Sequence, residues 1–251
     1  MITSSSGTSQ PTIVLMHGAF AESASWAGVL SRLLQAGHRA VAAPNPIRGV
    51  REDAAMLSAL VRALEGPVVL VGHSYGGAVI SNVDRDLDVR ALVYVAAFAP
   101  DDGESIGELA GRYPGSTLAE NVVPVPLEDG SSDLYIRQDR FHQQFCADVP
   151  EAQAKIMSIT QRPLRDVALE ERCGEPIWRR VPSWFLVPEL DRNIPAAAHR
   201  FMAERARARE IVEIAGASHA VAVSHPDETA ALIRRAVDAI TAGAETHPAL
   251  H

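Results

Sequence analysis

The sequence is poor in cysteine, in lysine and in long apolar runs, and each shortage excludes a class of protein. Only two cysteines are present, Cys146 and Cys173, and neither lies in a CxxC or Cys/His pattern, which argues against a disulfide framework and against a zinc site. No apolar run approaches the roughly 20 residues that span a bilayer, and the first residues lack a basic-then-apolar signal pattern. We therefore expect no metal, no membrane partner and a cytoplasmic location.

Acidic residues outnumber basic ones, 31 to 23. Lys155 is the only lysine, and the net charge is −8, so phosphate backbones and acidic lipid surfaces would be repelled. We expect no nucleic-acid partner. What the 251 residues do contain is an ordinary globular composition, 47% hydrophobic and 22% charged, which is enough for one large core with one insertion.

Short apolar segments alternate with amphipathic ones along most of the chain. The apolar segments are expected to be strands and comprise residues 12–16, 39–43, 68–71, 91–95, 183–187 and 210–214. The amphipathic segments are expected to be helices and comprise residues 23–36, 51–64, 78–83, 196–207 and 226–242. Near-continuous apolar strands separated by helices indicate an α/β fold, with a mostly parallel sheet covered by helices on both faces.

The alternation stops between residues 101 and 182. This stretch contains a proline-rich segment at Val122–Pro126, expected to be a loop, and two expected helices near 137–147 and 150–160. An insertion of this size between two strands is most simply a helical cap over a site. The expected division is a core of residues 11–100 and 183–243, a cap of residues 101–182, and flexible tails at 1–10 and 244–251.

Residues 72–76 read Gly-His-Ser-Tyr-Gly and follow an apolar strand. A G-x-S-x-G sequence between a strand and a helix forms a sharp turn that strains its central serine and lifts the hydroxyl above the sheet. The following amide, that of Tyr75, lies at a helix N-terminus, where it can donate to a developing oxyanion. Ser74 is therefore the candidate nucleophile.

A serine nucleophile needs a base and a carboxylate that orients the base. Asp191 and His219 each follow a predicted strand, and the order Ser, Asp, His is the one found in α/β-hydrolases. Asp101 or Asp102 remains an alternative acid. Three other histidines are less suited to act as the base. His73 is expected to point to the other side of the turn, and His225 to lie at a helix start on the surface. His142 is expected to belong to the cap.

The segment His17-Gly18-Ala19-Phe20 follows the first strand. A glycine loop in this place can turn an amide toward whatever lies above the sheet, so the amide of Ala19 is a second candidate oxyanion donor. His17 itself is either part of this site or a structural hydrogen bonder. The candidate substrate-binding residues near the site and on the underside of the cap are Phe20, Phe98, His142 and Phe145.

Together, the motifs at His17–Phe20, Gly72–Gly77, Asp191–Pro195 and Gly216–His219 resemble the α/β-hydrolase superfamily. The resemblance runs from about residue 12 to 242 and is strongest to the small branch of plant methylesterases and hydroxynitrile lyases. It implies Ser74 as nucleophile, His219 as base, Asp191 as acid, and the amides of Ala19 and Tyr75 as oxyanion hole. The superfamily's first two strands are missing here, which implies six strands in the order 2-1-3-4-5-6.

The expected function is hydrolysis of a carboxylic ester or lactone of a small, largely apolar molecule through an acyl-enzyme, with no cofactor. Two alternatives stay open on the sequence. One is a hydroxynitrile-lyase-like or cofactor-free perhydrolase enzyme, and the other is a hydrolase-fold ligand receptor. The oligomeric state is open as well, with a homodimer among the alternatives.

Overall fold

A computed structural model describes residues 10–245. The expected flexible tails lie almost wholly outside these residues. The core strands are β1 (Thr12–Met16), β2 (Arg39–Ala43), β3 (Val68–His73), β4 (Val89–Val95), β8 (Ser183–Pro188) and β9 (Glu210–Ile214). The core helices are the 3₁₀ turn η1 (Ser23–Trp26), α1 (Ala27–Gln35), α2 (Val50–Arg62), α3 (Tyr75–Ser81), α9 (Ala196–Arg205), α10 (Val221–Ser224) and α11 (Pro226–Glu245).

The six core strands form one sheet in the order β2-β1-β3-β4-β8-β9, and every neighbouring pair is parallel. The predicted strand order 2-1-3-4-5-6 is therefore confirmed, as is the α/β-hydrolase architecture. The central strands β1 and β3 are buried along their whole length, because helices cover both of their faces.

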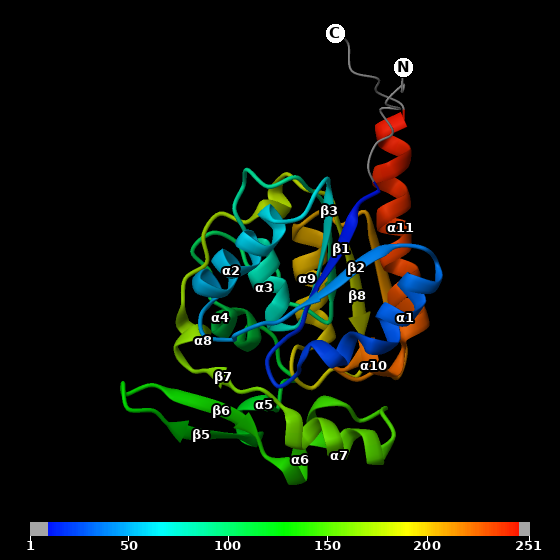
Figure 1. The fold of residues 1–251 in the computed structure, drawn as a ribbon. Helices are drawn as coiled ribbons and strands as arrows, with labels where there is room; N and C mark the ends of the chain where they lie inside the picture. The colour runs from blue at the N-terminus through cyan, green and yellow to red at the C-terminus, as the bar shows by residue number, and fades with distance from the viewer. Residues whose placement is uncertain (1–9, 246–251) are drawn as a thin grey trace, which may run out of the picture.

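Helices lie on both faces of the sheet (Figure 1), and two apolar clusters of side chains hold them there. On one face, Trp26, Leu33 and Ile233 bring η1, α1 and α11 against the odd-numbered positions of β1 and β3. On the other face, Leu57 of α2 and Met202 of α9 belong to the larger cluster, which also holds α3. The alternating sides of each strand thus feed two separate cores, as the strand periodicity requires.

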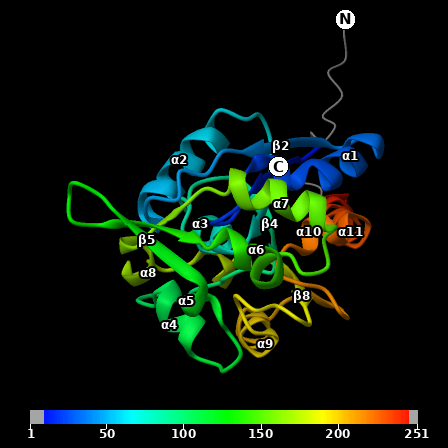
Figure 2. The same cartoon turned by 90° about the horizontal axis from the view of Figure 1, so that it is seen from below.

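We call residues 101–182 the cap. Its middle part, residues 118–165, lies across one end of the sheet, whereas its helices Ile106–Gly111 and Val167–Glu170 lie beside α2 and α3 (Figures 1 and 2). The cap elements are α4 (Ile106–Gly111), α5 (Leu118–Asn121), β5 (Val122–Pro126), β6 (Ser132–Ile136), α6 (Gln138–Phe145), α7 (Glu151–Thr160), β7 (Leu164–Arg165), α8 (Val167–Glu170) and the 3₁₀ turn η2 (Ile177–Arg179). The two predicted cap helices are present as α6 and α7.

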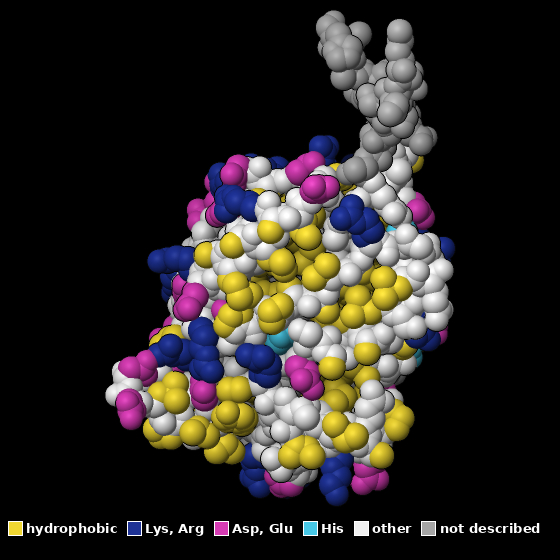
Figure 3. All heavy atoms as spheres, in the orientation of Figure 1, with side chains coloured by type: hydrophobic (Ala, Val, Ile, Leu, Met, Phe, Trp, Pro, Cys, Tyr) yellow, Lys and Arg dark blue, Asp and Glu magenta, His cyan; other side chains and the backbone are white. Residues whose placement is uncertain are grey.

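The expectation of a loop at Val122–Pro126 is wrong. This segment is β5, the edge strand of a three-stranded antiparallel sheet with β6 and β7. Pro124 and Pro126 occupy alternate positions, and an edge strand tolerates missing N–H groups on its open side. The cap is thus part sheet and part helix. Figure 3 shows apolar side chains on its surface, where Val123, Val125, Ile156 and Ile159 are large exposed ones.

Candidate active site

Ser74 stands alone between β3 and α3 in a strained conformation. Its φ is 53° and its ψ is −123°, a positive φ that non-glycine residues adopt only where the surroundings impose it. Its N–H donates to the carbonyls of Val95 and Ala96, at 3.3 and 3.1 Å. The end of the neighbouring strand β4 therefore holds the turn in place. The strained turn itself is what the G-x-S-x-G spacing predicts.

Three glycines let the backbones around this turn approach one another. A Cβ on Gly72 would lie 2.6 Å from the carbonyl oxygen of Gly76, and one on Gly76 would lie 2.5 Å from that of Met16. A Cβ on Gly77 would lie 2.3 Å from the carbonyl oxygen of Phe98. All three distances are far inside van der Waals contact, so no other residue fits the turn as it stands.

Asp191 and His219 form a buried pair. The Nδ1 atom of His219 lies 2.7 Å from Oδ2 of Asp191, and both side chains are fully buried. The alternative acid lies elsewhere: Asp101 forms an ion pair with Arg179 at 2.6 Å, and Asp102 is exposed and donates its own N–H to Asp101. Of the candidate acids, the geometry brings Asp191 to His219.

The carboxylate of Asp191 is stabilised in its charged form. Burial acts to raise its pKa, but the charge of His219 and hydrogen bonds from two histidines outweigh burial, so the pKa of Asp191 is lowered. Its Oδ1 atom also accepts the N–H groups of Asn193 and Ile194, at 2.7 and 3.0 Å. Asp191 is therefore an ionised acceptor that can hold His219 with Nδ1 protonated and Nε2 free to take a proton.

The Nε2 atom of His219 is buried and has no hydrogen-bond partner among residues 10–245. Ser74 and His219 are thus not joined by a hydrogen bond in this structure. Hydrogen bonds between catalytic groups are often long or misaligned without substrate and tighten in the complex. The unengaged Nε2 is the atom that would receive a proton from the serine hydroxyl.

The loop after β1 lies directly against the serine. A Cβ on Gly18 would come within 2.6 Å of the Cβ of Ser74, so the backbone of Ala19 runs beside the turn. The amide of Tyr75 is the first of α3 and has no acceptor within its own helix. These are the two amides expected to hold an oxyanion, and that role stays a prediction.

His17 anchors this loop by hydrogen bonds. Its Nε2 accepts the N–H of Asn45 at 3.0 Å, so Nδ1 carries the proton and donates to the carbonyl of Gly18 at 2.9 Å. Burial lowers the pKa of His17 to about 4. Phe20 has a φ of 59°, and its N–H donates to the carbonyl of Arg162 in the cap at 2.8 Å. Of the two interpretations of His17, the structural one fits these contacts.

His73 lies beside the candidate base. The two ring centroids are 4.8 Å apart, and Nε2 of His73 is 3.0 Å from the backbone carbonyl oxygen of His219, to which it must donate. Burial first, and then the charge of His219, lower the pKa of His73 to about 3, so the ring is neutral. The expectation that His73 points to the other side of the turn did not include this contact with His219, because no local sequence pattern indicates it.

The two other histidines considered as the base, His142 and His225, contact groups away from Asp191. His142 places Nε2 2.8 Å from the carbonyl oxygen of Val149, within the cap. His225 is half-buried, with Nε2 3.4 Å from Asp148 and Nδ1 3.8 Å from Glu228. Neither contacts Asp191.

Phe145 of α6 covers the candidate base. Its ring centroid lies 5.1 Å from that of His219 and 6.4 Å from that of Phe20, both in edge-to-face geometry. Phe98 is almost fully buried, and its N–H donates to the carbonyl of Ser74 at 3.1 Å. Of the four expected substrate-binding residues, Phe145 contacts His219, Phe20 contacts Phe145, and Phe98 is bonded to Ser74 through its backbone. The fourth, His142, is engaged within the cap.

The cap contacts the Asp191 loop and the His219 loop through adjacent residues of α6. Gln144 donates to the carbonyl of Arg192 and to Oδ1 of Asn193, at 2.9 and 2.7 Å, on the loop that carries Asp191. The carbonyl of Phe145 accepts the N–H of Ala220, next to His219, at 3.0 Å. The sequence did not indicate Gln144, because a polar residue on an amphipathic helix is usually exposed to solvent.

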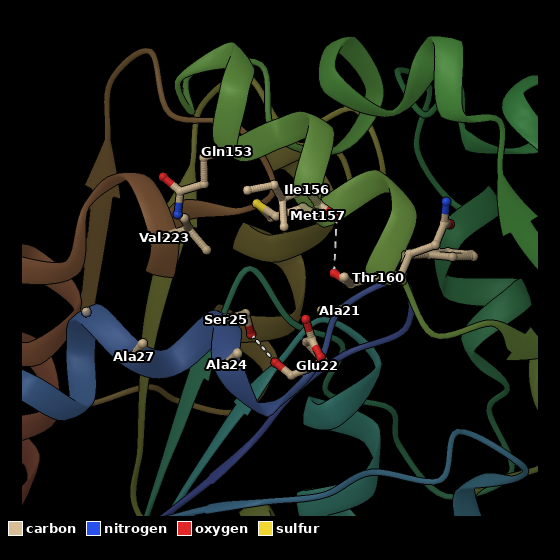
Figure 4. Close-up of a pocket in the computed structure, with 13 residues that line it drawn as sticks. Ala21, Glu22, Ala24, Ser25, Ala27, Gln153, Ile156, Met157, Thr160 and Val223 are labelled. Atoms are coloured by element: carbon tan, nitrogen blue, oxygen red, sulfur yellow. Dashed lines mark hydrogen bonds between the residues drawn. The ribbon is translucent and has the colours of Figure 1, made fainter.

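A cavity of about 250 Å³ lies between α7 and the segment that leads through η1 into α1, and Figure 4 shows the residues that line it. It is lined from α7 by Gln153, Ile156, Met157 and Thr160, and from the opposite side by Ala21, Glu22, Ala24 and Ser25. Phe20 also lines it, while Ser74 and His219 do not. Phe20 is thus shared between the cavity and the loop beside the serine.

Among residues 10–245, none of the helices is long and apolar enough to cross a membrane. Nor do these residues contain three or more His, Cys, Asp or Glu side chains grouped so as to hold a metal ion.

Comparison with known proteins gives consistent matches. Residues 13–232 match the model of the Alpha/beta hydrolase family. The rice (Oryza sativa subsp. japonica) protein named Esterase PIR7B is 27% identical over 252 residues, covering 89% of this chain and 94% of that protein. An Alpha-hydroxynitrile lyase of Arabidopsis thaliana is 23% identical over 239 residues, covering 86% and 92%. The crystal structure of the methylesterase protein MES16 from Arabidopsis superposes with a TM-score of 0.76 at 17% identity, covering 91% of this chain and 99% of that one.

Proposed function

This chain belongs to the alpha/beta hydrolase family, and from that premise we propose that it is a carboxylic ester hydrolase. Its proposed substrate is an ester or lactone of a small, largely apolar molecule. The observation that carries the proposal is the buried Asp191–His219 pair, joined at 2.7 Å, at the same sheet edge as the strained Ser74. An ionised acid, a base that it orients and a serine at the same sheet edge are the three parts that acyl transfer requires.

In the proposed reaction, Ser74 Oγ attacks the ester carbonyl carbon while Nε2 of His219 takes the hydroxyl proton. The amides of Ala19 and Tyr75 donate to the oxyanion of the tetrahedral intermediate. The proton then passes from His219 to the leaving alcohol, and an acyl group remains on Ser74. A water molecule, deprotonated by His219, attacks the acyl carbon and releases the carboxylic acid, which restores the serine hydroxyl.

The apolar part of the substrate is proposed to contact Phe20, Phe98 and Phe145. Support comes from their position around Ser74 and His219. The cavity in Figure 4 extends from Phe20 along α7 and is lined mainly by apolar side chains, so it offers room for a longer acyl or alcohol group. His142 receives no substrate contact in this proposal, because its Nε2 is engaged with Val149.

Labelling with a fluorophosphonate tests the nucleophile. We expect one adduct, located by peptide mass spectrometry on Ser74, and no adduct in Ser74→Ala. We also expect Ser74→Ala to hydrolyse p-nitrophenyl esters roughly 10⁴-fold or more slowly. Ser31→Ala, on the exposed surface of α1, is the matched control and should keep full activity. An unlabelled Ser74 in folded protein would overturn the proposal.

Replacing each candidate acid by its amide tests the assignment of Asp191. Asp191→Asn should lose roughly 10⁴-fold in kcat, since the amide favours the wrong tautomer of His219. Asp101→Asn should retain activity within about twofold, because Asp101 is paired with Arg179. Equal activity of Asp191→Asn and the parent protein would remove Asp191 from the mechanism.

The products and requirements of the reaction distinguish a hydrolase from the alternative functions. A lyase would release an aldehyde or ketone from a cyanohydrin, and a perhydrolase would need peroxide for its product. A ligand receptor would show negligible turnover on every ester while a bound ligand raised Tm. Turnover of a p-nitrophenyl ester series by wild type and not by Ser74→Ala is the result that supports hydrolysis.

A further inference from the structure

A second histidine contacts the carboxylate of Asp191. His199, on α9, is 1% exposed, and its Nε2 atom lies 3.0 Å from Oδ2 of Asp191. This is the same oxygen atom to which Nδ1 of His219 lies at 2.7 Å. Two imidazole rings from different elements therefore converge on one carboxylate oxygen.

The protonation of His199 follows from its surroundings. Asp191 is ionised and can only accept hydrogen bonds, so Nε2 of His199 must carry the proton. Its Nδ1 atom is buried and has no partner among residues 10–245. Protonating that nitrogen would bury an N–H without an acceptor, which is unfavourable. His199 is therefore a neutral donor to Asp191.

With His199 included, both oxygens of Asp191 are fully engaged. Oδ1 accepts the amides of Asn193 and Ile194, and Oδ2 accepts His199 and His219. A carboxylate offers about four acceptor sites, so it has no remaining freedom to rotate without losing a bond. One of these four donors, His219, is the group that the carboxylate has to orient.

We propose that His199 is a positioning residue for Asp191, which fixes the carboxylate in the orientation that His219 needs and moderates how strongly Oδ2 holds the His219 proton. This inference rests on the proposed hydrolase function for its kinetic readout only. A hydrogen bond from His199 withdraws negative charge from Oδ2 and so weakens its hold on protonated His219. His219 then becomes a free base at a lower pH than it would beside Asp191 alone.

The charged and titratable groups around this cluster are few. Asp191 and His219 face His199 directly, and His73, beyond His219, is neutral because burial lowers its pKa to about 3. From the cap, the group at the Asp191 loop is the uncharged Gln144. On α9 itself, Arg200 is paired with Glu213 and Arg205 with Glu104. The contact with Asp191 is thus the charged interaction available to His199.

The test compares His199→Leu, which removes the donor, with His199→Gln, whose side-chain amide can place an N–H near the position of Nε2. The kcat/KM of a p-nitrophenyl ester is measured against pH. In His199→Leu the acid limb is expected to move up by about one pH unit, since a hydrogen bond to a charged group is lost, and kcat is expected to fall about tenfold. In His199→Gln the acid limb should return to the wild-type position.

A readout without turnover accompanies the kinetics. In wild-type protein labelled with [¹⁵N]histidine, we expect two strongly downfield ring N–H protons, one on Nδ1 of His219 and one on Nε2 of His199. His199→Gln should lose the second and keep the first. This NMR result decides the hydrogen bond even if either variant is unstable or if the fluorophosphonate fails to label Ser74, in which case the hydrolase proposal fails separately.

Three outcomes would overturn the inference. One is a wild-type His199 without a proton on Nε2. Another is a lower kcat in both variants with an unmoved acid limb, which would mean that His199 only fills space. The third is wild-type kinetics in His199→Leu. A moved limb in His199→Leu together with rescue by His199→Gln supports it.

Discussion

The serine turn and the cap hold the candidate site by opposite means. The turn, residues 72–77, is fixed by backbone atoms in close approach, with three glycines where any Cβ would clash. The cap contacts the two candidate loops at separate points, through Gln144, which donates to the Asp191 loop, and through Asp148, whose carboxylate accepts a hydrogen bond from Ser218 beside His219. The first arrangement depends on local sequence, and the second depends on residues distant in the chain.

The difference has a consequence for function. A turn fixed by backbone contacts cannot adapt, so it suits the part of the reaction that is the same for every ester. The cap contacts the two candidate loops at a few points only, so its other residues can change without changing these loops, which suits the part that contacts a particular substrate. Changes in the two regions should therefore differ in what they disturb.

The largest effect is expected for a glycine of the turn. In Gly76→Ala the new Cβ would lie 2.5 Å from the carbonyl oxygen of Met16 and 2.9 Å from that of His17, both backbone atoms that cannot move aside. We expect the free energy of unfolding to fall by about 3 kcal/mol, measured by urea denaturation, together with loss of fluorophosphonate labelling.

Gly111 in α4 provides the matched control in the cap. A Cβ there would meet no atom within 4 Å, and alanine favours a helix over glycine. Gly111→Ala should leave labelling intact and stabilise the protein by about 0.5 kcal/mol. If Gly76→Ala were as stable as Gly111→Ala, the description of the turn as fixed by backbone contacts would be wrong.

A smaller effect is expected for the cap contact. Gln144→Leu preserves the size of the side chain but leaves the Arg192 carbonyl and Oδ1 of Asn193 without their donor. We expect a loss of about 2 kcal/mol in stability and about tenfold in kcat, because the Asp191 loop is no longer held in register. The exposed neighbour Gln143 is the control.

Gln143→Leu should change stability by less than about 0.5 kcal/mol and leave kcat unchanged. Equal behaviour of the two glutamine variants would show that the cap does not hold the Asp191 loop. A loss of stability in Gln144→Leu with an unchanged kcat would restrict the contact to folding.

The same contrast explains what could be predicted from the sequence. The strands, and the positions of Ser74, Asp191 and His219 at their ends, follow from local periodicity and from short motifs whose geometry the backbone imposes. The order of the strands in the sheet followed from the resemblance to the α/β-hydrolases. His199 and Gln144 could not be found that way, because their partners are distant in sequence and each lies on a helix that gives no local signal. Strand β5 was missed because Pro124 and Pro126 indicate a loop unless the sheet edge beside them is known.

The smallest expected effect is the loss of folding stability at acidic pH. Burial holds the pKa values of His73 and His17 at about 3 and 4, against about 6.5 in an unfolded chain. The unfolded state therefore binds more protons below pH 6.5, and stability is lost as the pH falls toward these values. Each histidine should contribute about 1 kcal/mol of this loss between pH 7 and pH 5.5.

Both histidines belong to the region fixed by backbone contacts, His73 in the turn and His17 in the loop beside it, so acid should weaken that region first. Asp191 acts in the same sense, because its pKa is also lowered, but its contribution is lost only below about pH 4. Urea denaturation of His73→Gln at pH 5.5, 7 and 8 isolates one histidine, since glutamine can still donate to the carbonyl of His219 but takes up no proton. The variant should lose about 1 kcal/mol less than wild type between pH 7 and pH 5.5, and an identical loss in both proteins would mean that His73 is already accessible to protons in the folded state.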